Sequence, residues 1–278
     1  MKKFILWFLA CLIIISAAIY QRMTGPTYPK RINITVNNAV QKLKLTRSLT
    51  ITEKSEVRLD IKDSNVRARL FFKRYKSDSK YEVAEFTYKA DPEHSGFFAD
   101  IPQQPVAGKL QYYIEITDLK GSQTYLKDSP VVIRFKGDVP AFVLIPHILL
   151  MFVAMLFSTL AGLMAIIKHP MYKKYAQWTL IFFIAGGMVL GPIVQFFAFR
   201  EFWTGIPFGW DLTDNKTLIA LIFWIIAVYM NKKSDRPIYT ILASIMLLLV
   251  FSVPHSLFGS EFNYSTGQVT NGIILNLF

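Results

Sequence analysis

Two histidines that follow prolines are the residues of this sequence best suited to chemistry. Pro146-His147 stands near the start of one apolar run, and Pro254-His255 stands at the end of another. The whole chain has four histidines. Because imidazole binds haem iron, copper and zinc, His147 and His255 are candidate axial ligands of a b-type haem or ligands of a divalent metal ion. The preceding prolines would hold the backbone rigid, which suits such a site.

The same two histidines also fit roles that need no cofactor. An amphipathic ring is common at the membrane boundary, and proline is a normal first residue of a helix. We therefore favour interfacial packing or a structural hydrogen bond for His147 and His255, with proton handling or ligand contact as a third interpretation. The sequence has no HxxxH or CxxC motif, and its apolar runs lack the second histidine pair that a two-haem bundle needs.

Further polar residues occur in the two segments that adjoin these histidines. Residues 200–216 connect two apolar runs, and residues 256–261 directly follow His255. When the runs cross a membrane, both segments lie at the same face. The sequence then predicts a polar cluster that contains His147, Arg200, Glu201, Asp211, Asp214, Lys216, His255 and Glu261.

The acids of this cluster suit two kinds of role. Asp211 or Glu261 would complete a copper or zinc site, and Asp211 with Asp214 would suit calcium, which prefers oxygen ligands. A structural role is more typical, in which the acids Asp211 and Asp214 cap the following helix and pair with Lys216 or Arg200. Thr213 is a further candidate cap. We favour the structural role.

The composition indicates an integral membrane protein. Of the 278 residues, 53% are hydrophobic and 15% are aromatic, which is too apolar for an ordinary soluble domain. The formal net charge is +12, but many of the basic residues flank the apolar runs. Part of the positive excess is therefore explained by residues that orient the spans in the membrane. A single cysteine, Cys11, rules out a disulfide framework within the chain. We expect the lipid bilayer as a partner and no nucleic acid.

Five apolar runs predict five transmembrane helices. Residues 1–21 form an N-terminal anchor, which we expect to remain uncleaved. A four-helix bundle over 140–254 contains the runs 142–167, 178–199, 218–230 (extended back to 213) and 239–253, and an extracytoplasmic tail follows over 255–278. Small residues at four-residue spacing predict close helix contacts at Ala154, Ser158, Gly162, Gly187 and Gly191.

Residues 22–139 have the pattern of an antiparallel β-sandwich of the immunoglobulin or fibronectin type III kind. Short alternating segments are separated by turn signals, and no helical period occurs between them. The basic residues between 67 and 80 indicate either a solvated strand face or contact with anionic lipids or an acidic partner. The expected strands are 31–36, 40–47, 57–61, 66–75, 83–88, 96–101, 109–117 and 131–135.

Basic residues in alternate loops predict the orientation in the membrane. Lysines precede the first run, and lysines or arginine separate the second from the third and the fourth from the fifth. Positive loops face the cytoplasm. The N-terminus is therefore expected in the cytoplasm of a bacterium, with the protein in its inner membrane and both the β-domain and the C-terminus in the periplasm or outside.

Three segments carry a resemblance to a group of bacterial membrane proteins to which no activity is assigned. They are residues 20–29 (YQRMTGPTYP), the loop 203–216 and residues 254–261 (PHSLFGSE). Members of that group combine an N-terminal anchor, an extracytoplasmic β-sandwich and a C-terminal helical bundle. The resemblance implies the same architecture over nearly the whole chain and implies no activity.

The expected function is binding, sensing or assembly with another envelope protein, without catalysis. The chain contains no nucleophile elbow, phosphate loop or H-E-x-x-H motif. A haem- or metal-binding redox protein that uses His147 and His255 is the alternative. A transporter or lipid-binding protein is a third possibility, and the absence of acidic or basic residues from the middle of the apolar runs argues against ion-coupled transport.

Overall fold

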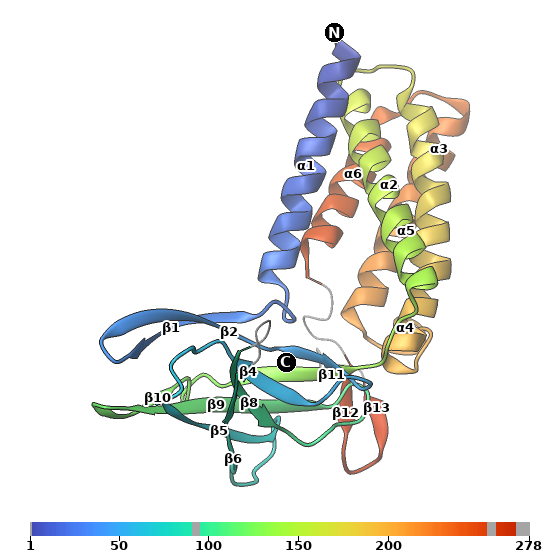
Figure 1. Ribbon diagram of the computed structural model, residues 1–278. Helices are drawn as coiled ribbons and strands as arrows, with labels where there is room; N and C mark the ends of the chain where they lie inside the picture. Colours follow the sequence, from blue (N-terminus) through green and yellow to red (C-terminus); the bar gives the residue numbers. More distant parts are fainter. Residues whose placement is uncertain (1, 91–94, 255–259, 271–278) are drawn as a thin grey trace. The chain divides into compact units, whose positions relative to one another are not determined.

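The computed structural model describes residues 2–90, 95–254 and 260–270 (Figure 1). These residues form two compact units. The helical unit comprises the described residues of Met1–Pro26 and Val139–Ser260, and the β unit comprises those of Thr27–Asp138 and Glu261–Thr270. The chain thus combines antiparallel sheets with apolar helices, and the hairpin near its C-terminus belongs to the β unit.

Long apolar helices build the helical unit. Its elements are α1 (Lys2–Thr24), α2 (Ala141–Ile166), α3 (Tyr172–Phe183), the π-helix η1 (Ile184–Leu190), α4 (Gly191–Phe199), α5 (Leu212–Lys233) and α6 (Pro237–Ser252). In the described chain, four helical stretches are long and apolar enough to cross a membrane: Lys3–Thr24, Ala141–Ile166, Tyr172–Phe199 and Leu212–Lys233. The fifth predicted span corresponds to α6, which is apolar but only 16 residues long. A straight crossing needs about 20 residues.

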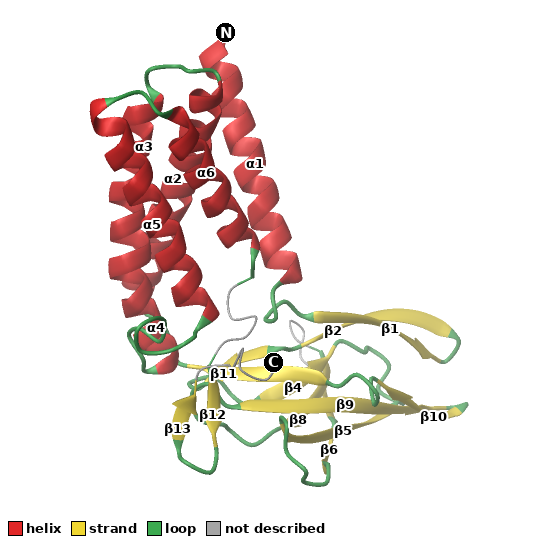
Figure 2. Cartoon of the chain, turned by 180° about the vertical axis from the view of Figure 1, so that it is seen from behind, coloured by secondary structure: helices red, strands yellow, loops and turns green. Residues whose placement is uncertain are grey.

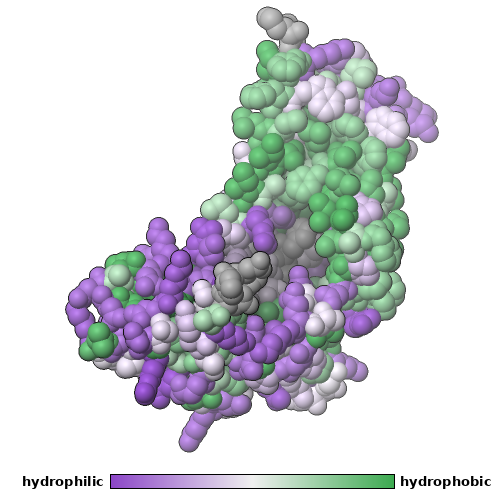
Figure 3. Space-filling view, in the orientation of Figure 1, coloured by the Kyte–Doolittle hydropathy of each residue, from purple (hydrophilic) through white to green (hydrophobic). Residues whose placement is uncertain are grey.

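Hydrophobic side chains cover the flanks of the helical unit, and hydrophilic ones gather where α1 begins (Figure 3). The end of α2, the start of α3 and the α5–α6 turn lie at that same end (Figure 1). We call it the basic end, because its exposed lysines are Lys3, Lys168, Lys174, Lys232 and Lys233.

Helix α2 lies at the centre of the unit and packs against α1, α3 and α6. Ala154, Ser158 and Gly162 are buried on it, as four-residue spacing on one helix face requires. A Cβ atom added at Gly162 would lie 2.4 Å from Ser244 Oγ of α6, so the two helices approach more closely than a side chain at position 162 allows. The fully buried Trp224 of α5 fills the adjoining core.

The third membrane-length helix begins six residues earlier than the apolar run suggested. Tyr172, Lys173 and Lys174 form its first turn, although their polarity placed them in a loop. An apolar run marks only the part of a helix that is suited to the hydrocarbon core of a membrane. The backbone hydrogen bonds of the helix can continue past that core into the headgroup region. The helix therefore carries polar side chains at the basic end.

The β unit contains one large sheet and three smaller ones. The large sheet has the order β3 (Ser48–Thr50), β11 (Val131–Lys136), β9 (Lys109–Asp118), β5 (Arg67–Arg74) and β6 (Glu82–Glu85), and β10 (Gly121–Tyr125) also pairs with β9. A second sheet has the order β4 (Glu56–Leu59), β8 (Gly96–Asp100) and β7 (Thr87–Lys89). The hairpins are β1 (Lys30–Val36) with β2 (Ala39–Leu45), and β12 (Glu261–Asn263) with β13 (Gln268–Thr270). Figure 2 shows the strands from behind.

One hydrophobic core joins the large sheet, the β4–β8–β7 sheet and the first hairpin. Its fully buried members include Leu43 of β2, Leu59 of β4, Leu70 of β5, Ile114 of β9 and Ile133 of β11. Inward and outward side chains alternate along β2 and β5, as expected for strands with one face on a core.

Within residues 22–139 the strand pattern differs from the expected one at three places. The polar strand β10 lacks apolar alternation, so the sequence indicated only a turn there. The strand forms because a tight turn after β9 brings residues 121–125 back to pair with β9. The run 83–88 divides at the buried Phe86 between β6 and β7, which belong to different sheets. The short strand β3 pairs with β11 in parallel, whereas the sequence predicted a purely antiparallel fold.

Candidate functional site

His147 binds the π-helix within the helical unit. Its Nδ1 lies 2.9 Å from the carbonyl oxygen of Gly186. Because a carbonyl only accepts hydrogen bonds, Nδ1 carries the proton. The N–H of Gly191 donates to the same oxygen in the i→i+5 pattern of a π-helix. His147 thus makes a structural hydrogen bond to a distorted helical segment, and Gly187 and Gly191 lie in or directly after that segment.

The second histidine of the proposed pair, His255, lies outside the described residues. Ligation of haem or metal by His147 and His255 therefore stays a prediction. Within the described parts of the chain, no group of three or more His, Cys, Asp or Glu side chains is placed to hold a metal ion.

Asp211 and Asp214 anchor the 200–211 segment to the start of α5. Asp211 is the N-cap: its Oδ1 accepts from the N–H of Thr213 at 2.8 Å and of Asp214 at 3.1 Å. Of the caps that the sequence suggested, Asp211 is confirmed, whereas Asp214 and Thr213 are wrong, because the helix already begins at Leu212. Asp214 instead accepts from the N–H of Thr204 at 2.6 Å and from Gln195 Nε2 at 3.1 Å.

The basic residues of the predicted cluster have separate environments. Lys216 is 6% exposed and donates to the carbonyl oxygen of Val253 at 2.6 Å. Arg200 ends α4 in a left-handed conformation, with its guanidinium 5.8 Å from the ring centroid of Phe196, and Glu201 is exposed. In the helical unit, Asp211, Asp214 and Lys216 thus each hydrogen-bond to backbone groups, and a shared ligand stays a prediction.

Glu261 belongs to the β unit, where it pairs with two lysines. Lys109 Nζ lies 2.6 Å and Lys76 Nζ 3.2 Å from its carboxylate oxygens. Burial lowers the pKa of Lys109 to about 8 despite this contact. Burial also acts to raise the pKa of Glu261, but the hydrogen bonds and charges of Lys109 and Lys76 outweigh it and hold that pKa below its ordinary value. The ion pair attaches the β12–β13 hairpin to β9.

Acidification is expected to loosen the β12–β13 hairpin. Glu261 has a lower pKa in the folded state than in the unfolded state, so its stabilisation is complete above the unfolded value of about 4.5 and is lost as pH falls through the folded value. Hydrogen exchange in residues 261–270, corrected for intrinsic rates, should therefore accelerate between pH 5 and pH 3 relative to the rest of the β unit. Glu261→Gln should remove this extra acceleration, and an unchanged pH profile in that variant would contradict the assignment.

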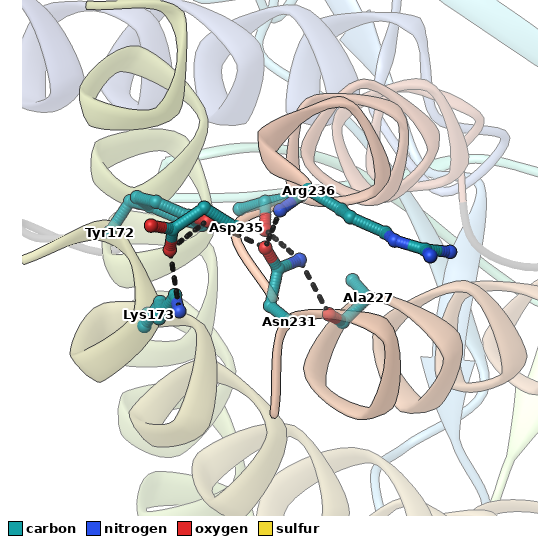
Figure 4. A network of polar contacts seen from close by, with 7 residues as sticks. Tyr172, Lys173, Ala227, Asn231, Asp235 and Arg236 are labelled. Atoms are coloured by element: carbon teal, nitrogen blue, oxygen red, sulfur yellow. Dashed lines mark hydrogen bonds and ion pairs between the residues drawn. The ribbon is translucent and has the colours of Figure 1, made fainter. Parts of the chain in front are cut away.

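A second polar network joins three helices at the basic end (Figure 4). Asn231 of α5 is its centre: Oδ1 accepts from the hydroxyl of Tyr172 at 2.6 Å and from the N–H of Arg236 at 2.8 Å. Its Nδ2 donates to the carbonyl oxygen of Ala227 at 2.8 Å. Lys173 and Asp235 add an ion pair at 2.5 Å. Sequence reasoning missed this network, because each member looked like an ordinary polar residue at the end of an apolar run.

The β unit contains a cleft of about 240 Å³ with a marked excess of positive charge. Lys44 of β2, Arg47 of the β2–β3 link and Arg58 of β4 line it, and Asp60 is the single acid among the lining residues. We call it the basic cleft. Thr27, Pro29, Thr46 and Ser48 complete its lining.

Hydrogen bonds to two backbone carbonyl oxygens hold part of the lining of the basic cleft in place. The carbonyl oxygen of Thr46 accepts from the hydroxyl of the buried Tyr112 at 2.8 Å, and that of Arg47 accepts from the N–H of Arg134 at 3.1 Å. The link between β2 and β3 is thus fixed to the large sheet. Arg47 and Arg58 are therefore presented by a rigid frame, as a preorganised binding site requires.

The cations of the basic cleft are only partly neutralised. Arg58 Nε lies 2.8 Å from Asp60 Oδ1, and Arg47 donates to the carbonyl oxygen of Tyr28 at 3.5 Å. Burial lowers the pKa of Arg47, because a buried guanidinium is less well hydrated than one in water. Among the described residues Lys44 has no side-chain partner. An anion in the cleft would restore the lost solvation of Arg47 and pair Lys44.

Sequence reasoning pointed to a different basic stretch, residues 67–80. There Arg69 pairs with Glu115, Lys73 donates to the carbonyl oxygen of Ser77, and Lys76 pairs with Glu261. The basic cleft escaped notice because its residues come from three segments that only the fold brings together.

Comparisons of the chain with protein-family models, with curated proteins and with solved structures find no match.

Proposed function

We propose that this protein is a membrane-anchored, non-enzymatic binding protein whose β unit holds an acidic segment of a partner protein in the basic cleft. The observation that carries the proposal is the charge of the cleft, in which Lys44, Arg47 and Arg58 face one carboxylate. A guanidinium group matches a carboxylate with two parallel hydrogen bonds, and such bonds are about twice as strong as neutral ones.

The size of the cleft supports recognition of one or two side chains. A volume of about 240 Å³ is smaller than a typical pocket for a drug-sized ligand, which begins near 300 Å³. A Glu or Asp side chain fits this space together with part of its backbone. The partner would therefore contribute a short acidic stretch, and the charge of the cleft would speed its association and set its specificity.

The basic end of the helical unit supports an orientation in the membrane with that end on the cytoplasmic side. Its exposed lysines favour the cytoplasmic side of a bacterial inner membrane. The β unit and the C-terminus then lie in the periplasm or outside, and the partner is another envelope protein. The shared core of the two larger sheets supports an immunoglobulin- or fibronectin type III-like sandwich as the fold that presents the cleft.

The proposal is tested with the full chain in neutral phosphatidylcholine nanodiscs and fluorescent dodecapeptides. An oligoglutamate peptide should bind more tightly than oligoglutamine, and its affinity should fall as salt rises. Lys44→Gln should weaken oligoglutamate binding about fivefold, and Lys44→Gln with Arg58→Gln at least about 20-fold, as loss of one and then two exposed ion pairs of about 1 kcal/mol each implies. Fluorescence anisotropy gives each Kd.

Lys42→Gln is the matched control. Lys42 lies two residues before Lys44 on the same exposed face of β2 but does not line the basic cleft. It should bind like the wild type. Equal losses in the Lys42 and Lys44 variants would mean that general surface charge attracts the peptide, and equal affinity for oligoglutamate and oligoglutamine would overturn the proposed function.

A further inference from the structure

The helical unit has a groove of about 290 Å³ near its basic end. Phe157 of α2 forms one wall, and Tyr175, Trp178 and Phe182 of α3 form the other, with Met171 and Lys174 at the start of that helix. Lys174 and Phe182 are eight residues apart, so the α3 wall is about 12 Å long. The groove therefore combines a long apolar wall with one cation at its end.

Aromatic contacts give the groove a fixed shape. The ring centroid of Phe157 lies 5.6 Å from that of Tyr175 and 5.7 Å from that of Phe182. Trp178 stacks on Phe182 at 5.7 Å, and Trp7 of α1 packs edge-on against Tyr175 at 5.8 Å. These rings support one another from three helices. The walls are thus preformed, and an occupant would not have to order them.

The polar groups of the groove lie at one end and are available to a ligand. Within the described chain neither the Lys174 ammonium nor the Tyr175 hydroxyl has a side-chain partner, whereas neighbouring Lys173 is paired with Asp235. Lys174 lies in the first turn of the membrane-length stretch Tyr172–Phe199, so it is at the level of lipid headgroups. Trp178, 42% exposed, places the other end of the groove on the lipid-facing surface.

We propose that this groove is a binding site for one anionic phospholipid. The phosphate pairs with Lys174 and accepts a hydrogen bond from Tyr175, and the upper part of one acyl chain lies along Trp178 and Phe182. Charge complementarity selects this occupant: the basic end carries the exposed lysines 3, 168, 174, 232 and 233, and basic pockets between transmembrane helices recognise anionic headgroups. The proposal is independent of the basic cleft and of its partner.

Native mass spectrometry of the full chain in detergent, titrated with phosphatidylglycerol or phosphatidylcholine of equal chain length, tests the site. The first phosphatidylglycerol should bind at least about fivefold more tightly than phosphatidylcholine, and Lys174→Gln should remove that difference. Lys232→Gln is the matched control, since Lys232 is exposed at the same end but does not line the groove. Equal affinity for both lipids, or equal losses in the two variants, would overturn the proposal.

A second measurement locates the bound acyl chain. Phosphatidylglycerol with brominated chains should quench the tryptophan fluorescence of the wild type more than brominated phosphatidylcholine does. Trp178→Phe should lose most of this difference, whereas Trp210→Phe, outside the groove, should keep it. Displacement of phosphatidylglycerol by millimolar inorganic phosphate would show that the site takes free phosphate rather than lipid. Retention of the full quenching difference in Trp178→Phe would place the acyl chain elsewhere. Either result refutes the assignment.

Discussion

Replacement of Gly162 by leucine is expected to destabilise the helical unit by about 3 kcal/mol, the upper part of the range for overpacked cores. Even the Cβ atom would lie 2.4 Å from Ser244 Oγ and 2.7 Å from Ser244 Cβ, so α2 and α6 would have to separate. A loss of this size lowers the thermal unfolding midpoint by roughly 6–12 °C for a chain of this length. Differential scanning fluorimetry of the full chain in a mild detergent measures it.

Smaller substitutions test the same contact between Gly162 of α2 and Ser244 of α6. Gly162→Ala should also lower the midpoint, and Ser244→Gly in the same chain should restore much of the loss because it removes both atoms that the new methyl group meets. Gly191→Ala should be tolerated, since its nearest neighbour would be 3.7 Å away. A Gly162→Ala protein as stable as the wild type would show that α2 and α6 are not packed this closely.

Replacement of Asn231 by leucine is the second substitution with a large expected effect. It removes the closer acceptor of the Tyr172 hydroxyl, which keeps only a 3.5 Å contact to Asp235 Oδ1, and it removes the acceptor of the Arg236 N–H. An unpaired buried donor costs about 1–3 kcal/mol. Hydrogen bonds between transmembrane helices are worth about 0.6 kcal/mol on average. We therefore expect a total loss of about 2 kcal/mol, measured as reversible unfolding in mixed detergent and SDS micelles.

A double-mutant cycle isolates the contact between α3 and α5. Tyr172→Phe alone should cost about 1 kcal/mol and should cost almost nothing in the Asn231→Leu background, because the bond is already absent. Thr240→Val is the control, since it removes only the 3.3 Å contact to Asn231 Nδ2. Additive losses for the Tyr172 and Asn231 variants would mean that the network of Figure 4 does not couple the two helices.

The elements of the fold that depend on local pattern could be predicted well. Residues 142–167 correspond to α2, and seven of the eight expected strands correspond to single strands of the β unit, because a period of two or a long apolar run is visible in a short window. The polar strand β10 was missed for the converse reason, since its only signal is the partner strand β9. The split between β6 and β7 likewise depends on which sheet each half joins.

The candidate sites were harder to predict from residue types alone. His147 and Glu261 were predicted to share one polar cluster, which stays a prediction; the contacts that the structure gives them are a bond from His147 to Gly186 and an ion pair of Glu261 with Lys109 of the β unit. Both Asp211 and Asp214 were predicted to cap α5, and only Asp211 does so. A side chain near a membrane boundary has many possible partners, and local sequence does not say which of them packing will bring within hydrogen-bond distance.

The sequence by itself determined that this protein has long apolar helices, a β-rich segment between the first and second of them, and basic residues at alternate helix ends. These properties follow from hydropathy, strand period and charge, which act over a few residues. Only the tertiary structure decided that Lys44, Arg47 and Arg58 share one cleft and that Phe157 meets Tyr175 and Phe182 beside Lys174. Both sites join residues from separate segments, and only the packing of a whole unit brings such residues together.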